Sequence, residues 1–547
     1  MKRTAYALLG AACAAALLTP WSASADDIVW DGSAGDGFWT NGPQNVNNTA
    51  FPNNPGVGAN WTVNAGTPGQ IIAPDIGPGG NMIDYTFNGH DWTINNATLS
   101  EDVQVKLDGG SLNITNSTVS LLPSSANTTA GLSGLNLGQG GNPTTAVFTS
   151  STVNVSRSNQ NGSALRVLNG SSLSLVDTTV NATSEFGNGT VIVENAGSSL
   201  VMDATSVINA ATFRLATTGA AGSIGATVNG GTIAATADIR LNGINNTLTA
   251  NNADISAATF QMTNTNSALV VTGGTFAISN TVSITNIGST ATLTNADVDV
   301  TTGFEITNPG AVITLDGGTI DTGYIRLNSG SEDVQDLMFN LISGTVTLTD
   351  ANPFRDNSGF EGQFDWTGAV GAAAVTHVDL SANNTNLAAK IAQGFFSIDG
   401  TRVNPSLSHT VDWTDPANIG TLNAELAALA VNNKRLELVQ DLGAGTQTLS
   451  LLSALVPGDT DGDGDIDDSD LGTAFSNYTG PLPPGTGGKT AADGDTDGDG
   501  DVDDSDLGTA FSGYTGPLGP ATVPEPTSLA LLGLAGLLTA RRRRATR

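Results

Sequence analysis

Two short stretches of the chain concentrate carboxylate side chains at a fixed spacing. In the first stretch, aspartates occupy positions 1, 3, 5, 7, 9 and 12, with Gly464 at position 6 and Ile466 at position 8. These aspartates are Asp459, Asp461, Asp463, Asp465, Asp467 and Asp470. Carboxylates this close repel one another unless a cation lies between them, and Ca²⁺ takes about six to eight hard oxygen ligands. The spacing therefore predicts that this loop binds a calcium ion.

The second stretch repeats the first almost without change. In GDTDGDGDIDDSDLGTAFSNYTGPL and its copy from Gly494, only Ile466 and Asn477 are replaced, by Val and Gly. The repeated carboxylates are Asp495, Asp497, Asp499, Asp501, Asp503 and Asp506. This is the EF-hand arrangement, in which positions 1, 3 and 5 supply side-chain oxygens, position 7 a backbone carbonyl, and position 12 closes the shell. We therefore expect two bound Ca²⁺ ions.

Each loop precedes a helical segment and has no room for a helix before it. Residues 458–518, with a linker from Pro481 to Gly494, resemble the type I dockerin. The resemblance implies docking onto a cohesin domain through helix residues. The corresponding residues are Asp468, Ser469, Leu471, Phe475, Tyr478, Leu507, Phe511 and Tyr514. Asp468 stands where dockerins often carry Ser or Thr, so the resemblance does not define the cohesin. The alternative is an acidic stalk stiffened by calcium, in the manner of thrombospondin type 3 repeats.

Residues suited to acid–base chemistry do not complete an active site. His377 shares a predicted strand face with Asp379, and His409 lies near Asp412, but neither pair has a visible nucleophile or metal partner. Four arginines share one outward register, namely Arg166, Arg214, Arg240 and Arg326. The equivalent slots at 261, 283 and 305 hold Gln, Ser and Glu. A solvated β-face is therefore expected rather than a lyase or hydrolase site, and no catalytic residue is predicted.

The N-terminus reads as an export signal. Lys2 and Arg3 precede an apolar run, and Ala23-Ser24-Ala25 offers the small residues that a signal peptidase requires. Residues 1–25 are therefore predicted to be a signal peptide. The single cysteine, Cys13, lies inside it, so packing or bound ions, rather than disulfides, must stabilise the mature chain.

Residues 523–547 resemble the PEP-CTERM sorting signal. The triplet Pro524, Glu525 and Pro526 precedes an apolar run, 529–540, and four arginines, 541–544. The resemblance implies recognition of the triplet by exosortase, and a place on the cell surface or in the extracellular matrix of a Gram-negative-type bacterium. As a helix the apolar run would span about 18 Å, less than a hydrocarbon core of about 30 Å. We therefore expect transient membrane contact; a plain membrane tail is the alternative.

The charge of the chain limits its partners. It has 19 basic and 51 acidic residues and a net charge of −32. Removal of both signals takes away seven basic residues and one acidic residue, which leaves 12 basic and 50 acidic residues and a net charge of −38. Such a surface repels nucleic acid and attracts cations.

The middle of the chain, residues 90–330, has the periodicity of a stacked β-structure. A phrase recurs in which alternating apolar residues, a small polar turn and a closing apolar residue follow one another. The closing residues are Leu99, Val119, Val153, Val180, Val207, Ile233, Ile255, Phe276, Val298 and Ile320. Their spacing settles at about 22 residues, typical of a solenoid rung of two or three short strands.

We predict a mainly β protein whose core is a right-handed parallel β-helix. The periodicity resembles that of pectate-lyase-like and adhesin-like surface solenoids, which implies a shape and not a chemistry. Asn195, Asn264, Asn286 and Asn308 follow inward residues and are expected to stack as amide ladders. An antiparallel β-sandwich array is the alternative, since the early rungs vary in length.

The flanking regions are expected to close the solenoid. Residues 26–89, with Trp30 and Trp39, are predicted to form an N-terminal cap, although aromatics beside glycine turns also suit sugar stacking. Residues 331–456 are predicted to form a β-rich terminal domain. It is expected to contain short helices at 387–393 and 422–429, a hairpin over 436–452, and Trp366 and Trp413 as core or capping residues.

The sequence thus indicates an exported surface or matrix protein with a structural or adhesive role. Its expected partners are a polysaccharide or a cohesin-like protein, besides signal peptidase and exosortase during export. The alternative is a carbohydrate-active enzyme, a β-helix lyase or hydrolase that its dockerin brings into a complex. A passive stalk that binds nothing is a third possibility.

Overall fold

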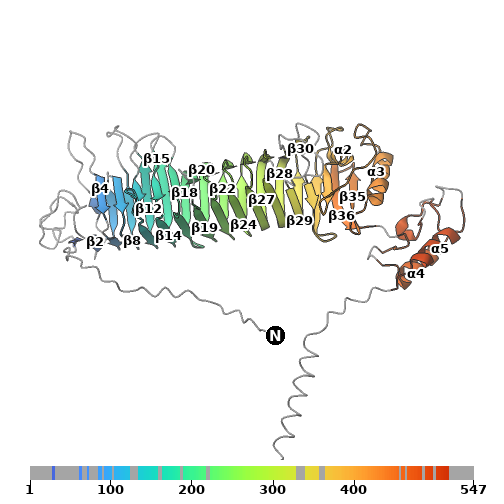
Figure 1. Ribbon diagram of the computed structural model, residues 1–547, viewed down its shortest axis with the longest axis horizontal. Helices are drawn as coiled ribbons and strands as arrows, with labels where there is room; N and C mark the ends of the chain where they lie inside the picture. Colours follow the sequence, from blue (N-terminus) through green and yellow to red (C-terminus); the bar gives the residue numbers. More distant parts are fainter. Residues whose placement is uncertain are drawn as a thin grey trace, which may run out of the picture. The chain divides into compact units, whose positions relative to one another are not determined.

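The computed structural model shows a mainly β protein with short helices near its C-terminus (Figure 1). It describes residues 28–30, 61–64, 70–72, 84–88, 91–101, 104–122, 134–157, 163–184, 189–216, 222–308, 310–327, 339–355, 364–454, 457–461, 465–482, 487–496 and 500–516. The chain forms two compact units, residues 1–314 with 318–320, and residues 315–317 with 321–547. None of the helices in these described ranges is long and apolar enough to cross a membrane.

The first unit is a parallel β-solenoid whose rungs contribute strands to three columns. The first column contains β1 (Ile28–Trp30), β2 (Trp61–Asn64), β5 (Trp92–Asn95), β8 (Ser111–Thr115), β11 (Thr145–Thr149), β14 (Ser172–Val176), β17 (Ser199–Met202), β19 (Gly225–Asn229), β21 (Thr247–Asn251) and β24 (Ala268–Thr272). The second contains β3 (Gln70–Ile72), β6 (Thr98–Glu101), β9 (Thr118–Leu121), β12 (Thr152–Arg157), β15 (Thr179–Ser184), β22 (Asp254–Ala257) and β25 (Thr275–Ile278). The third contains β4 (Asp84–Asn88), β7 (Gln104–Asp108), β10 (Leu135–Leu137), β13 (Leu165–Leu168), β16 (Thr190–Glu194), β23 (Thr259–Met262) and β26 (Thr281–Ile284).

Three longer strands turn corners and so belong to more than one column. They are β18 (Val207–Ala216), β20 (Thr232–Leu241) and β27 (Thr290–Ile306). Every strand pairing described within the three columns is parallel. The predicted parallel β-solenoid is therefore confirmed, and the antiparallel sandwich is excluded.

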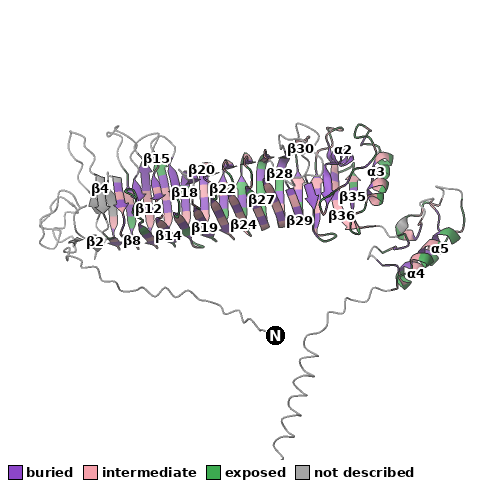
Figure 2. Cartoon of the chain, viewed as in Figure 1, coloured by how far each residue is buried: buried purple, intermediate pink, exposed green. Residues whose placement is uncertain are grey.

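Alternation of buried and exposed residues builds the solenoid core (Figure 2). Most of the closing residues expected from the sequence pair in register, as Val153 does with Val180 and Ile255 with Phe276. Val207 is the exception, because Val180 pairs with Ile208, which is fully buried, and Val207 pairs with Thr179. In this rung the repeated pattern of apolar residues is aligned one residue too early. A shift of one residue in a strand moves every side chain to the other face of the sheet.

The turn between the first and second columns explains the asparagine and glycine content. In several rungs the same turn position adopts the left-handed conformation, with φ between 46° and 50° at Asn96, Asn116, Ser150, Asp177, Asn252 and Asn295, and glycine takes the position at Gly230 and Gly273. Asparagine and aspartate tolerate this conformation better than other non-glycine residues. The small polar residues of the repeated pattern are thus explained by the left-handed backbone conformation that this turn needs.

The second unit begins with parallel strands too. These are the C-terminal part of β28 (Val312–Leu327), β29 (Phe339–Leu348), β30 (Phe354–Arg355), β31 (Phe364–Trp366), β32 (Ala373–His377) and β33 (Phe396–Ile398). Their core is aromatic: the rings of Phe339 and Phe364 stack with centroids 4.5 Å apart, and Trp366 is fully buried. Parallel pairing therefore continues through residues in which the sequence period fades.

An antiparallel hairpin ends this sheet. Strand β36 (Thr446–Ser453) forms the predicted hairpin with β35 (Lys434–Asp441). It also pairs with β32, which was not predicted, and β34 (Thr401–Arg402) folds back on β33. Helix α3 (Pro416–Ala428) presents Asn423 to the free edge of β35. The Asn423 amide accepts a hydrogen bond from the Leu438 N–H and donates one to the Leu438 carbonyl, both at 2.9 Å.

The two helices predicted at 387–393 and 422–429 are present, the second with an earlier start. Helix α2 (Leu387–Ala392) is wholly buried, and α3 begins earlier than expected because Asp415 caps it and Pro416 occupies its first turn. Trp413 is 1 % exposed, in keeping with a core role. Helices α4 (Asp468–Ser476) and α5 (Asp504–Gly513) and the 3₁₀ turn η1 (Ala491–Asp493) complete the unit.

Candidate functional site

The two acidic stretches form a loop–helix module, residues 457–516, in which each loop leads into a helix. Asp467 caps α4: its side chain accepts a hydrogen bond from the Ser469 N–H, and Asp470 accepts one from the Asp467 N–H at 2.9 Å. Asp503 and Asp506 repeat this capping box at the start of α5. Such boxes satisfy backbone donors that a helix start leaves open. Positions 9 and 12 of each loop are thereby fixed by the helix that follows.

The carboxylates of the first loop converge. Asp459, Asp461 and Asp470 each bring an oxygen within 4.8 Å of the others, and so do Asp465, Asp467 and Asp470. Asp470 belongs to both groups and is 1 % exposed. Its Oδ1 accepts hydrogen bonds from the N–H and the hydroxyl of Thr460, at 2.6 and 3.0 Å. Position 12 thus ties the start of the loop to its end.

The second loop has the same construction. Asp501, Asp503 and Asp506 bring oxygens within 4.8 Å of one another, and the Asp506 Oδ1 accepts the Thr496 N–H at 2.6 Å. Asp495 is 4 % exposed, and its Oδ2 accepts the N–H of Gly500, the glycine at position 6. The expected ligands Asp463, Asp497 and Asp499 lie outside the described residues.

The donor set fits a hard divalent cation. Six loop aspartates are buried, namely Asp459, Asp465, Asp470, Asp495, Asp501 and Asp506. Burial alone would raise the pKa of Asp470, but hydrogen bonds from the backbone of Asp467 and Thr460 outweigh it and lower the pKa, so the carboxylate stays ionised. Buried ionised carboxylates need a counter-charge, and carboxylate oxygens are what Ca²⁺ prefers.

Each loop also forms hydrogen bonds with a threonine that follows the helix of the other repeat. The N–H of Val502, at position 8 of the second loop, donates to the Thr479 hydroxyl at 3.0 Å, and the Thr479 N–H donates to the Val502 carbonyl at 2.9 Å. Thr515 makes the corresponding bonds to Ile466, both at 3.0 Å. Ile466 and Val502 are fully buried. This crossed arrangement joins the two loops and could not be read from the spacing of the repeats.

The expected docking residues divide into two sets. Phe475 and Phe511 are 54 % and 53 % exposed and contact each other edge to face, with ring centroids 5.8 Å apart. Tyr478 and Tyr514 are also exposed. We call the paired rings of Phe475 and Phe511 the aromatic face. Leu471 and Leu507 are half-buried, and Ser469 is exposed.

Asp468 has an internal partner. The Tyr514 hydroxyl donates to the Asp468 Oδ1 at 2.9 Å, and the Tyr478 hydroxyl donates to Asp504 at 3.0 Å in the other repeat. The bond to Asp504 raises the pKa of Tyr478. Asp468, which the resemblance places at a recognition position, therefore helps to hold the repeats together.

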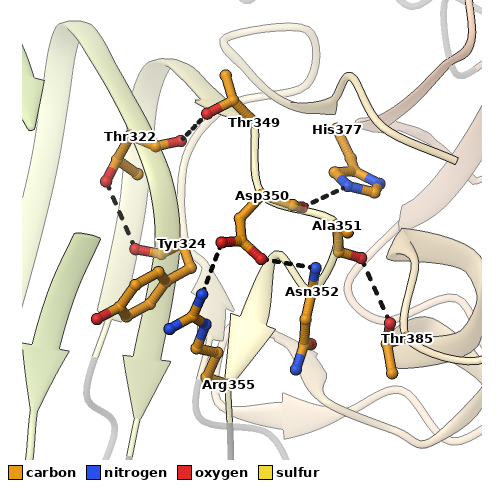
Figure 3. Close-up of polar contacts among 9 residues, drawn as sticks. All are labelled: Thr322, Tyr324, Thr349, Asp350, Ala351, Asn352, Arg355, His377 and Thr385. Carbon is orange, nitrogen blue, oxygen red and sulfur yellow. Dashed lines mark hydrogen bonds and ion pairs between the residues drawn. The ribbon is translucent and has the colours of Figure 1, made fainter. Parts of the chain in front are cut away.

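The two histidines considered in the sequence have different surroundings, since His377 is buried and His409 is exposed. His377 lies in β32, fully buried, and its Nε2 donates to the Asp350 carbonyl at 2.9 Å (Figure 3). Asp350 also binds the Arg355 guanidinium at 2.6 Å, and Arg355 lies 3.7 Å from the centre of the Tyr324 ring. Asp379 accepts a hydrogen bond from the Ser381 N–H at 2.8 Å. His409 contributes its backbone carbonyl to the indole N–H of Trp413.

The shared register is confirmed for Arg166, Arg214 and Arg240, with Ile192 between the first two, and ion pairs occupy part of it. Arg214 pairs in register with Arg240, and Arg240 with Gln261. Arg166 lies 2.9 Å from Glu194, and Arg240 lies 2.8 Å from Asp238. The neighbouring carboxylates are thus partners of arginines in ion pairs on the strand face.

Most of the amide ladders lie at asparagines that were not predicted from the sequence. Asn195 donates to the Asn169 side chain at 2.7 Å, and Asn264 to the Asn242 carbonyl. A longer ladder joins Asn154, Asn181 and Asn209 on the second column, with amide bonds of 2.9 Å. Its members recur at intervals of one rung, which is the signal that could have revealed them.

Comparison with known proteins bears on the C-terminus. Residues 522–544 match the PEP-CTERM protein-sorting motif. The chain carries a surface-sorting signal. The motif implies recognition by exosortase and an exported protein of the cell envelope or surface. No curated protein and no solved structure matches the chain. The predicted signal peptide, Trp39, and Pro524, Glu525 and Pro526 lie outside the described residues.

Proposed function

We propose that this exported β-solenoid is a structural or adhesive protein of the cell surface or extracellular matrix of a Gram-negative-type bacterium. In this proposal two Ca²⁺ ions fill the acidic loops, and the loop–helix module docks the protein onto a cohesin-like partner or a matrix polysaccharide. The observation that carries the proposal is the crossed pair of acidic loops beside the exposed aromatic face.

The chemistry of calcium supports the loops as its site. Two dications would offset the like charges of the clustered carboxylates, and the capping boxes couple the loop to the helix. Ion binding would therefore order the helices that present the aromatic face. Exposed apolar groups of this kind mark interaction surfaces.

Calorimetric titration of the full exported chain with Ca²⁺ tests the metal step. We expect two sites and a gain of helix in circular dichroism. Asp470→Ala should abolish the first site, because it removes a carboxylate shared by both groups of the first loop. Asp468→Asn is the matched control: it lies two residues away, keeps an acceptor for Tyr514, and should leave Ca²⁺ binding unchanged. Two intact sites in Asp470→Ala would contradict the assignment.

The docking step needs its own test. A type I cohesin domain, immobilised in the presence of Ca²⁺, should retain the wild-type chain and release it on chelation. Phe475→Ser combined with Phe511→Ser should abolish retention while both calcium sites remain. Retention that survives this double change would place the contact elsewhere.

An enzymatic role is distinguished by products. Incubation with a panel of polysaccharides should give no new reducing or unsaturated ends. Their appearance would favour a carbohydrate-active enzyme, and the ion-paired arginine column would then have to be reconsidered.

A further inference from the structure

The second column of the solenoid carries a long surface hollow, which we call the groove. Two adjoining hollows of about 550 and 360 Å³ share Thr236 as a common wall residue. Together they cross β12, β15, β18, β20, β22, β25 and β27 (labelled in part in Figure 1). Because neighbouring strands lie about 4.8 Å apart, the groove is about 29 Å long.

Short side chains form the floor of the groove. Alanines occupy it in consecutive rungs, between 5 % and 7 % exposed, namely Ala182, Ala210, Ala211, Ala235 and Ala257. In the same column Val155 pairs with Ala182 on one side, and Ile278 with Ala257 on the other. Val155 is 0 % and Ile278 1 % exposed, so this register faces the core, and the alanines reach the groove only at their small exposed surface.

Amides form one edge of the groove. The Asn181 side chain donates to Asn154, and the Asn209 side chain donates to Asn181, both at 2.9 Å. The ladder stops inside the groove, because Asn209 pairs in register with Ala234, which has no polar side chain. An amide has two N–H donors and two acceptor sites, so each ladder member keeps hydrogen-bonding capacity for a ligand.

We propose that the groove binds a linear neutral glycan along the solenoid axis. This inference rests on the adhesive function proposed above and names its ligand class. Amides that both donate and accept suit sugar hydroxyls, and the exposed methyl group of Ala277 offers apolar contact for ring C–H groups. No lysine or arginine is among the described residues that line the groove, and Asp299 lies at one end. With a net charge of −32, the chain would repel a polyanionic glycan.

The test uses the full exported chain in Ca²⁺ with three probes: cellohexaose, mannohexaose and hexagalacturonate. We expect calorimetric binding of a neutral hexasaccharide and none of hexagalacturonate. Asn181→Leu combined with Asn209→Leu should weaken the neutral interaction by about tenfold or more, because it removes two amides that bind the ligand. The matched control is Asn251→Leu, in the Asn251–Asn229 ladder outside the groove, which should bind as the wild type does.

A second variant tests the floor without altering the amides. Ala277→Trp places a large side chain at an exposed position that lines the groove, and it should also reduce binding while the melting temperature is kept. Equal binding by the groove variants and the control variant would show that the groove is not the glycan site. The proposed adhesive function would then have to lie on another surface. Binding of hexagalacturonate alone would overturn the ligand class. A wild-type chain that binds none of the three probes would overturn this inference, whereas calcium-dependent cohesin docking would still be judged by its own experiment.

Discussion

At the scale of single residues, a few carboxylates and amides serve two structures at once. The Asp470 side chain binds the loop start through Oδ1 and the helix start through Oδ2. The spacing of the aspartates predicted Asp470 as a calcium ligand. It did not distinguish that role from a role in the capping box, because position 12 of the loop is also the third residue of the helix. Asp468 shows the converse, since its bond to Tyr514 depends on how the two repeats fold together.

His377 makes stability depend on pH. Burial lowers its pKa, although the hydrogen bond to the Asp350 carbonyl and the nearby Asp379 charge oppose this. The unfolded chain takes up the proton near pH 6.5, whereas the folded chain does so only at lower pH. The contribution of neutral His377 to the free energy of unfolding is therefore complete above pH 6.5. It is lost as the pH falls, by up to about 1.4 kcal/mol per pH unit.

Urea denaturation of the full chain at a series of pH values checks this. His377→Gln keeps a donor for Asp350 but cannot titrate, so we expect a smaller loss of stability between pH 6.5 and 5. Identical pH dependence in wild type and variant would show that other groups cause the loss.

At the scale of elements, each loop of the loop–helix module packs against the helix of the other repeat. Gly494, which precedes the second loop, has φ +106°, and a Cβ there would lie 2.6 Å from the Ala474 side chain of α4. Gly458 has a similar position against Ala510 of α5. The sequence predicted two loop–helix units, but the packing of each loop on the other helix involves residues far apart in the chain.

Two glycine substitutions separate this packing from helix propensity. Gly494→Ala should destabilise the module by more than about 1 kcal/mol, because it combines a close contact with an unfavourable φ. Gly472→Ala lies within α4 with open space around it, and should stabilise the helix by up to about 1 kcal/mol. Thermal melting followed by circular dichroism in Ca²⁺ measures both. Equal effects would mean that the crossed packing does not contribute.

At the scale of the whole molecule, the sequence predicted the solenoid well because its period is repeated many times. Register errors arose where a rung departs from the period, as at Val207, and parallel pairing continued in the second unit where aromatic residues replace the phrase. The groove was not predicted, because an alanine within an alternating apolar pattern predicts a core residue in the same way as a valine or an isoleucine does. Such a hollow depends on the sizes of side chains that become neighbours only after stacking.

Removal of calcium should affect one part of the chain. Among the described residues, the carboxylate clusters that could hold a metal all lie in the loop–helix module. Backbone ladders and buried aliphatic side chains hold the solenoid strands. Differential scanning calorimetry should therefore show a transition that chelation lowers and another that it leaves in place. A shift of every transition would mean that the solenoid also depends on metal.

Asn423 has a consequence for how the protein behaves at high concentration. A free strand edge is a template on which another chain can add a strand and start a fibre. By occupying both backbone groups of Leu438, the amide removes one such attachment point from β35. At this position the protein resists polymerisation with its own copies through a single side chain.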